Sequence, residues 1–337
     1  MSDPAAKSIP KGTLADIGEF GLINALRESL TTADAESGDV LLGPGDDAAV
    51  VAVASGSVVV TTDVLVQGVH FRTDWAPAYD IGRRAAAASL ADIAAMGARA
   101  TALVVALAAP ADVEVAWAMS MADGLRDEAA QVGAFVVGGD VARSRELSIC
   151  VTALGDLEGR MPVTRSGAQV GDVVAVCGRL GWAEAGLAVL SRGFGSPRAL
   201  VDAYRRPDPP YAAGIAAAVA GATAMCDVSD GLVADVGHIA AESAVGIDLR
   251  SAAFDMPEPL QAVAAAYGTN PLEWMLAGGH DHAMVATFPP AADLPDGFVA
   301  IGEVVDAKDV EVKYRATGRV SVDGELWEQP GGHAHYR

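Results

Sequence analysis

The sequence predicts an α/β protein of two domains with mixed sheets. Its 337 residues are enough for two domains. Short apolar runs of strand type alternate with longer segments of helical periodicity in both halves, as expected for two α/β units. Residues 155–171 between them are polar, rich in glycine and aperiodic, which indicates a junction. The predicted domains are residues 1–157 and 158–337.

Four strands and two helices are predicted in the first half. The strands are residues 58–62, 101–107, 134–137 and 147–154, and the helices are residues 81–96 and 113–131. The β-branched run of the first strand ends close to Asp63. On the first helix Asp92 shares an otherwise apolar face with Ala85, Ala88 and Met96. Most acidic motifs are therefore expected at strand ends, where open α/β sheets place ligand sites.

The second half restarts with a strand and a glycine turn that opens a helix. The predicted elements are strands 172–177, 224–227 and 283–288, a turn at Gly178–Gly181 and a helix over 230–244. A weak alternation continues over residues 310–328. These elements complete a second α/β domain.

Composition limits the partners and the compartment. The formal net charge of -21 argues against nucleic acid and against an anionic membrane surface, because both need basic protein surfaces. The longest uncharged stretch, Tyr211 to Cys226, is too short to span a membrane, and Met1 to Gly12 has no apolar signal core. The three cysteines form no CxxC pair. These features predict a cytoplasmic protein with reduced thiols.

Five short motifs place aspartates at predicted turns. They are Gly45-Asp46-Asp47, Thr61-Thr62-Asp63, Ala91-Asp92-Ile93-Ala94-Ala95-Met96-Gly97, Gly138-Gly139-Asp140 and Asp227-Val228-Ser229-Asp230-Gly231. None contains Lys or Arg, so a metal ion is the expected counter-charge, and oxygen ligands suit Mg²⁺, Ca²⁺ or Mn²⁺. The alternative is that each aspartate caps a helix or a turn, which is also the simpler interpretation of Asp46.

Common nucleotide-binding motifs are missing. The sequence has no Walker motif, no GxGxxG after a strand and no protein-kinase signature. If the chain handles nucleotide phosphates, carboxylate-bound metals must take the place of a lysine cradle. Phosphoryl transfer permits this, because it needs in-line positioning and neutralisation of charge.

Taken in order, the motifs resemble those of the thiamine-monophosphate kinase family. The resemblance rests on the five aspartate motifs together with Gly68-Val69-His70-Phe71 and Thr164-Arg165-Ser166-Gly167-Ala168, and it extends from Gly18-Glu19-Phe20 to the C-terminal tail. It implies the two-domain fold of the aminoimidazole ribonucleotide synthetase superfamily, with an N-terminal domain that binds ATP and metal and a C-terminal α/β domain. It also implies a homodimer and ATP-dependent conversion of thiamine monophosphate to thiamine diphosphate.

The resemblance assigns roles at matching positions. Two or more Mg²⁺ ions are expected, with ATP as co-substrate. The implied metal ligands are Asp47, Thr61, Thr62, Asp63, Asp92, Asp140, Asp227 and Asp230. Contacts to ATP are expected from Gly139, Asp140, Arg165, Ser229 and Asp230, with Arg143 a further candidate. His70, His280 and His333 are expected to contact thiamine monophosphate.

The substrate side departs from the family pattern. Where the family commonly has Gly-Gly-Glu-Asp-Tyr, this chain has Gly278-Gly279-His280-Asp281-His282. Near the end, His333 stands where the family tends to carry an aromatic residue. The two histidines around Asp281 could also indicate a transition-metal site, although no thiol accompanies them.

Two rival functions follow from the same residues. The first is another ATP-dependent enzyme of the superfamily; the selenophosphate branch needs a reactive Cys near the N-terminus, whereas the first cysteine here is Cys150. The second is a non-catalytic acidic protein that binds divalent cations, but compact DxDxDG loops are absent from the sequence.

Overall fold

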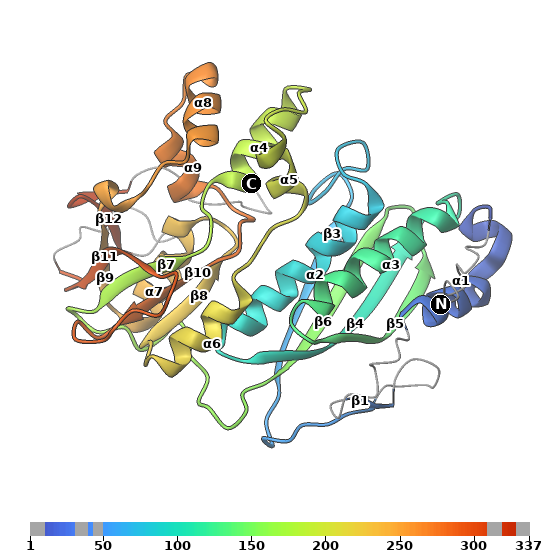
Figure 1. Ribbon diagram of the computed structural model, residues 1–337, viewed down its shortest axis with the longest axis horizontal. Helices are drawn as coiled ribbons and strands as arrows, with labels where there is room; N and C mark the ends of the chain where they lie inside the picture. Colours follow the sequence, from blue (N-terminus) through green and yellow to red (C-terminus); the bar gives the residue numbers. More distant parts are fainter. Residues whose placement is uncertain (1–10, 31–39, 43–49, 309–318, 328–337) are drawn as a thin grey trace, which may run out of the picture. The chain divides into compact units, whose positions relative to one another are not determined.

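The computed structural model describes residues 11–30, 40–42, 50–308 and 319–327 (Figure 1). The chain forms two compact units: unit 1 is Met1–Ser89 with Ala100–Asp156, and unit 2 is Leu90–Arg99 with Leu157–Arg337. Because unit 2 also takes Leu90–Arg99, the predicted division at residue 157 stays a prediction. Asp47 and His333, two predicted site residues, lie outside the described residues.

Unit 1 is built on a four-stranded mixed sheet of order β3-β6-β4-β5. Its elements are α1 (Leu14–Leu30), β1 (Val40–Leu42), β2 (Val50–Val51), β3 (Val59–Val66), α2 (Ala78–Ala95), β4 (Arg99–Ala109), α3 (Val115–Ala130), β5 (Phe135–Arg143) and β6 (Ser148–Asp156). β3 runs antiparallel to β6, and β4 parallel to β5. The last turns of α2 belong to unit 2.

Unit 2 is built on a seven-stranded sheet of order β13-β12-β9-β11-β7-β10-β8. Its strands are β7 (Val173–Cys177), β8 (Ala224–Val228), β9 (Gly246–Leu249), β10 (Ala283–Phe288), β11 (Val299–Val305), β12 (Val320–Val322) and β13 (Glu325–Leu326). Its helices are α4 (Trp182–Ser191), α5 (Arg198–Arg205), α6 (Tyr211–Val219), α7 (Leu232–Ser243), α8 (Glu258–Tyr267) and α9 (Pro271–Ala277), with a 3-10 turn at Ser251–Ala253. All pairings are antiparallel except that of β12 with β9. The predicted mixed sheets are confirmed.

The core of unit 2 is made mostly of small side chains. Ala175, Ala286 and Ala217 are fully buried, together with the larger Phe288 and Met284. Phe288 packs edge-on against Phe298 with ring centroids 5.4 Å apart. Small residues let helices approach the sheet closely, which accounts for the alanine-rich composition. Within the described residues, every helix is too short or too polar to cross a lipid bilayer.

Two predicted strand ends are wrong. Asp63 lies in the middle of β3, and Asp140 lies within β5, which continues through Gly138-Gly139 to Arg143. The glycines do not break β5, because Gly139 packs directly on β4: a Cβ there would lie 2.0 Å from the Val105 carbonyl oxygen. Glycine inside a strand here marks close backbone approach and not a turn.

Candidate functional site

Antiparallel pairing brings three loops of unit 2 to one end of its sheet. Ala283 of β10 pairs with Val228 of β8, and Met284 pairs with Cys177 of β7. The loops that follow β7 and β8 and the loop that precedes β10 therefore lie at the same end. These loops, residues 178–181, 229–231 and 278–282, are called the loop cluster below.

Backbone hydrogen bonds join two loops of this cluster directly. The His280 N–H donates to the Ser229 carbonyl oxygen at 2.8 Å, and the His282 N–H donates to that of Val228 at 2.9 Å. A Cβ on Gly279 would lie 2.5 Å from the Ser229 oxygen, so only glycine permits this approach. The predicted substrate residue His280 and the predicted nucleotide residue Ser229 are thus held side by side.

The backbone of the 278–282 loop is strained at two histidines. His280 has φ +69° and His282 has φ +54°, both in the left-handed region that non-glycine residues rarely adopt. Such conformations cost free energy and persist where the surrounding structure enforces them, often at functional sites. Here the hydrogen bonds to Ser229 and Val228 enforce them.

Asp227 is buried against a histidine that the sequence had not linked to it. Its Oδ2 lies 2.8 Å from Nδ1 of His282, and the two side chains are only 4% and 7% exposed. Since an ionised carboxylate can only accept a hydrogen bond, the imidazole donates from Nδ1. The aspartate predicted as a metal ligand is therefore fixed by a hydrogen bond from His282 at the end of β8.

Asp235 is a site carboxylate that the sequence interpretation missed. Its Oδ2 accepts the N–H groups of Asp230 at 3.1 Å and Gly231 at 3.0 Å, which shapes the loop that follows β8. Burial, together with the nearby charges of Asp227 and Asp230, raises the pKa of Asp235 to about 8. Its position in the first turn of α7 was the available signal, because acidic residues there cap free N–H groups.

Asp281 fastens the loop cluster to α4. Its Oδ1 accepts the Ala183 N–H at 2.9 Å, at the start of a helix whose N-cap residue, Gly181, has no side chain to cap it. The other oxygen, Oδ2, is buried without a hydrogen-bond partner. Burial raises the pKa of Asp281 to about 7, although the N–H groups at the start of α4 act in the opposite direction.

In unit 1, Thr62 and Asp63 point to opposite faces of β3. The Ser89 hydroxyl on α2 donates to Asp63 Oδ2 at 2.7 Å. The hydroxyl of Thr62 lies 3.0 Å from that of Thr152 on β6, on the more exposed face. Adjacent residues of a strand alternate faces, so Asp63 and Thr61 share a side that Thr62 does not.

Asp140 is exposed on β5, at the opposite edge of the same sheet from Asp63. Three strand spacings separate β5 from β3, which is about 14 Å at ~4.8 Å per strand. Unit 1 by itself therefore does not bring Asp63 and Asp140 together. Gly139 and Arg143 are also exposed on β5, and Asp92 is half-buried on α2 in unit 2.

His70 lies in a turn directly after β3. Its Nδ1 accepts the Val66 N–H at 3.0 Å, so Nδ1 carries no proton and a neutral ring carries its proton on Nε2. Gly68, with φ +84°, makes the turn possible. The predicted substrate histidine is therefore held in one tautomer by the end of its own strand.

The main chain of Arg165 lies away from the other nucleotide residues predicted in unit 2. Its carbonyl oxygen accepts the hydroxyl of Ser243, the last residue of α7, whereas Ser229 and Asp230 precede the first turn of that helix. A helix of 12 residues is about 18 Å long. The segment that leads into Arg165 runs beside the start of β8, where the Met225 N–H donates to the Thr164 carbonyl oxygen.

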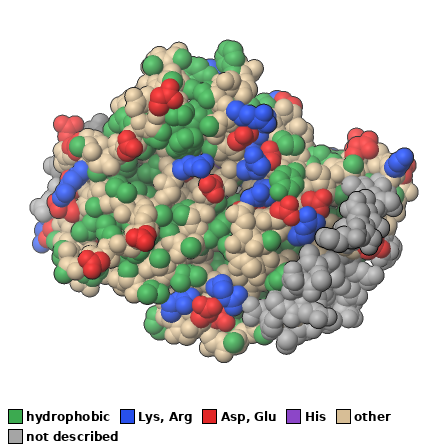
Figure 2. Space-filling model, viewed as in Figure 1, with side chains coloured by type: hydrophobic (Ala, Val, Ile, Leu, Met, Phe, Trp, Pro, Cys, Tyr) green, Lys and Arg blue, Asp and Glu red, His purple; other side chains and the backbone are tan. Residues whose placement is uncertain are grey.

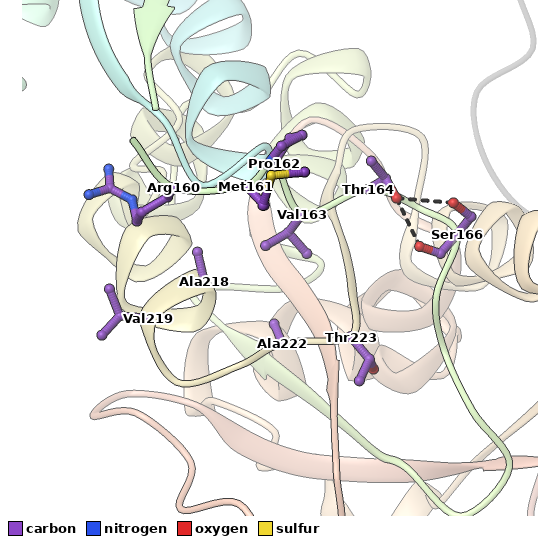
Figure 3. Close-up of a pocket in the computed structure, with 10 residues that line it drawn as sticks. All are labelled: Arg160, Met161, Pro162, Val163, Thr164, Ser166, Ala218, Val219, Ala222 and Thr223. Carbon is purple, nitrogen blue, oxygen red and sulfur yellow. Dashed lines mark hydrogen bonds between the residues drawn. The ribbon is translucent and has the colours of Figure 1, made fainter. Parts of the chain in front are cut away.

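A hollow of about 410 Å³ lies beside this segment (Figure 3). Its lining is Arg160, Met161, Pro162, Val163, Thr164, Ser166, Ala218, Val219, Ala222 and Thr223. The Thr164 hydroxyl donates to the Ser166 carbonyl oxygen at 2.8 Å, and the Thr223 hydroxyl donates to Asp172 at 2.6 Å. The hydroxyl groups of Thr164 and Thr223 already have hydrogen-bond partners. The hollow adjoins the start of β8, whereas the loop cluster lies at the end of that strand, so the hollow does not belong to the loop cluster.

The carboxylates of unit 2 fit a hard divalent cation. Asp227 and Asp230 lie near enough to Asp235 for their charges to raise its pKa. The oxygen atoms of all three side chains are of the kind that Mg²⁺ prefers as ligands. Within the described residues, no three His, Cys, Asp or Glu side chains form a ready metal cage. A site of one or two carboxylates completed by phosphate and water is the usual arrangement for Mg²⁺.

Comparisons with known proteins identify the family. Residues 45–157 match the N-terminal domain model of AIR synthase related proteins, and residues 169–315 match the C-terminal domain model. Thiamine-monophosphate kinase of Mycobacterium tuberculosis strain H37Rv is 48% identical over 316 residues, which are 94% of this chain and 90% of that protein. The chain belongs to the thiamine-monophosphate kinase family.

Solved structures of the thiamine-monophosphate kinase family share its fold. The crystal structure of the Stenotrophomonas maltophilia K279a enzyme has a TM-score of 0.77 and 31% identity, covering 92% of this chain and 98% of that one. The structure of AaThiL complexed with AMPPCP and TMP has a TM-score of 0.75 and 30% identity, covering 98% and 100%. The predicted family and its two-domain fold are confirmed.

Proposed function

We propose that this protein is an ATP-dependent kinase that phosphorylates thiamine monophosphate to thiamine diphosphate and releases ADP. Identity of 48% to a thiamine-monophosphate kinase over 94% of the chain carries the proposal. The related AaThiL structure holds AMPPCP, an ATP analogue, together with TMP. The loop cluster adds a structural argument, because it holds the predicted substrate residue His280 against the predicted nucleotide residue Ser229.

We further propose two or more Mg²⁺ ions with carboxylate ligands in each unit. The ligands proposed in unit 1 are Asp47, Thr61, Thr62, Asp63 and Asp140, and those in unit 2 are Asp92, Asp227 and Asp230. The position of Thr62 on the other face of β3 makes it the weakest member of this set for a side-chain ligand. When bound, Mg²⁺ neutralises phosphate charge during transfer.

The residues of this chain bind ATP, its metals and thiamine monophosphate and hold them in position. Gly139, Asp140, Arg165, Ser229 and Asp230 are the proposed contacts for ATP or its metals, and His70, His280 and His333 those for thiamine monophosphate. Phosphoryl transfer needs little covalent help from the protein, so direct in-line transfer between the two substrates is expected. No serine or histidine of the sequence is placed as an obvious nucleophile with its own base.

A homodimer in the cytoplasm is proposed as the working form. β3 is an edge strand, and Val60 and Val64 on its outer face are 60% and 51% exposed. An apolar edge of this kind favours association with another chain. Light scattering should give a mass near twice the 34.2 kDa of one chain.

On the face drawn in Figure 2, basic and acidic side chains are interspersed, with no continuous basic surface for nucleic acid.

A coupled ADP-release assay tests the activity. Purified protein with ATP and Mg²⁺ is expected to release ADP with thiamine monophosphate, and much less with free thiamine or without an acceptor. Chelation of the divalent ion should abolish release, because the phosphate charge is then unneutralised. Release that does not depend on thiamine monophosphate, or a labelled phosphoryl-protein trapped in turnover, would contradict the proposal.

His280→Glu tests the departure in the substrate loop. Neutral imidazole supplies no negative charge, whereas the glutamate of the family can pair with a cationic or hydrogen-bond-donating part of thiamine. The variant is expected to lower the KM for thiamine monophosphate about fivefold, or ~1 kcal/mol, at pH 8, with the KM for ATP nearly constant. A thiamine monophosphate KM that is unchanged or higher would show that His280 does not replace the glutamate.

A further inference from the structure

The buried pair of His282 and Asp227 lies between the two functional loops of unit 2. Asp227 occupies the end of β8, and His282 immediately precedes β10, the strand that pairs with it. Nδ1 of His282 lies 2.8 Å from Oδ2 of Asp227, and each side chain is more than nine-tenths buried. The activity proposed above assigns no role to this imidazole.

The backbone of His282 is held in an unfavourable conformation where its side chain contacts Asp227. His282 has φ +54°, and its N–H is anchored on the Val228 carbonyl oxygen at 2.9 Å. A non-glycine residue in the left-handed region costs free energy relative to glycine. The anchor and the side-chain bond together fix the imidazole on two neighbouring residues of one strand.

The contact with His282 involves only one oxygen of the Asp227 carboxylate, Oδ2, and leaves Oδ1 outside this hydrogen bond. It restricts the rotamer of the carboxylate without adding a Lys or Arg side chain at the site. Hydrogen bonds of this kind to ligating carboxylates orient them and raise metal affinity.

We propose that His282 is a positioning residue that holds the Asp227 carboxylate in the orientation required to bind a divalent cation. The inference rests on the metal role proposed for Asp227. It assigns a task to the histidine that stands where the family commonly has tyrosine.

Binding of Mn²⁺ to the nucleotide-free protein, followed by the electron paramagnetic resonance of free Mn²⁺, tests the proposal without turnover. Two variants remove the donor: His282→Phe keeps a ring of similar size, and His282→Gly tolerates the left-handed backbone. Each is expected to weaken Mn²⁺ binding about 10–100-fold. His282→Asn should retain most of the affinity, because its side-chain amide offers a donor near the position of Nδ1 and asparagine tolerates positive φ.

Two further variants separate this proposal from the metal assignment itself. His238→Phe, at an exposed histidine on α7, should leave Mn²⁺ binding at the wild-type level. Asp227→Asn should weaken it at least as much as loss of the His282 donor. Wild-type affinity in both His282→Gly and His282→Phe, with weakened binding in Asp227→Asn, would overturn the positioning role alone. Wild-type affinity in Asp227→Asn would overturn the metal role and the positioning role together.

Discussion

Replacing Asp227 with Asn is expected to lower the turnover of thiamine monophosphate by about 100-fold or more, the scale observed when one preorganised electrostatic group is lost. The substitution keeps the shape of a side chain that is 4% exposed and can still accept the hydrogen bond from His282. It removes one negative charge from the proposed cation site. The measurement is steady-state ADP release at saturating ATP, thiamine monophosphate and Mg²⁺.

The stability of the Asp227→Asn variant should not fall with its turnover. The charge of Asp227 contributes to the raised pKa of Asp235, so removing it relieves carboxylate repulsion when no metal is bound. The free energy of unfolding without ligand is therefore expected to hold or to rise. Asp255→Asn, at an exposed position of unit 2 outside every motif, is the matched control for both measurements.

The same substitution at Asp63 or Asp140 extends the test to unit 1. Each should also lower turnover about 100-fold, because each carboxylate is proposed to face Mg²⁺. For Asp63 the Ser89 hydroxyl can still donate to the amide oxygen, so local geometry is preserved. Near-normal turnover in two of the three variants would remove the carboxylates from the mechanism.

The fold could be predicted from the sequence where hydrophobic periodicity was decisive. Residues 283–288 form β10 as predicted, and the glycine turn at Gly178–Gly181 opens α4. Periodicity failed at β5, where Gly138-Gly139 was interpreted as a turn. The deciding fact was the closeness of Gly139 to Val105, which depends on the pairing of β5 with β4 and has no local signal.

The motif residues of the candidate site were predictable, but the contacts that support them were not. Asp227 and Ser229 belong to one recognisable motif, whereas His282 meets Asp227 only because β8 and β10 are antiparallel in one particular register. Asp281 caps a helix 98 residues earlier in the chain. Such partners depend on tertiary pairing, so sequence spacing alone could not have revealed them.

Asp281→Asn is expected to change how the stability of the protein depends on pH. The pKa of Asp281 is raised from its ordinary value of 3.8 to about 7, chiefly by burial. Between these two values the folded state binds a proton that the unfolded state releases. The contribution of Asp281 to the free energy of unfolding is therefore fully present below about pH 4 and is lost as the pH rises through 7. At ~1.4 kcal/mol per pH unit, the loss amounts to about 4 kcal/mol at most.

Asparagine keeps an oxygen for the Ala183 N–H but cannot ionise. In urea unfolding with a chelator present, the variant should match the wild type near pH 4 and exceed it by several kcal/mol at pH 8.5. Asp255→Asn, exposed in the same unit, is the matched control at both pH values. A difference between Asp281→Asn and wild type that is the same at both pH values would show that the carboxyl ionises in the folded state as it does in the unfolded chain. The unpartnered Oδ2 would then have to be reached by water, and Asp281 would cap α4 as an ordinary charged residue.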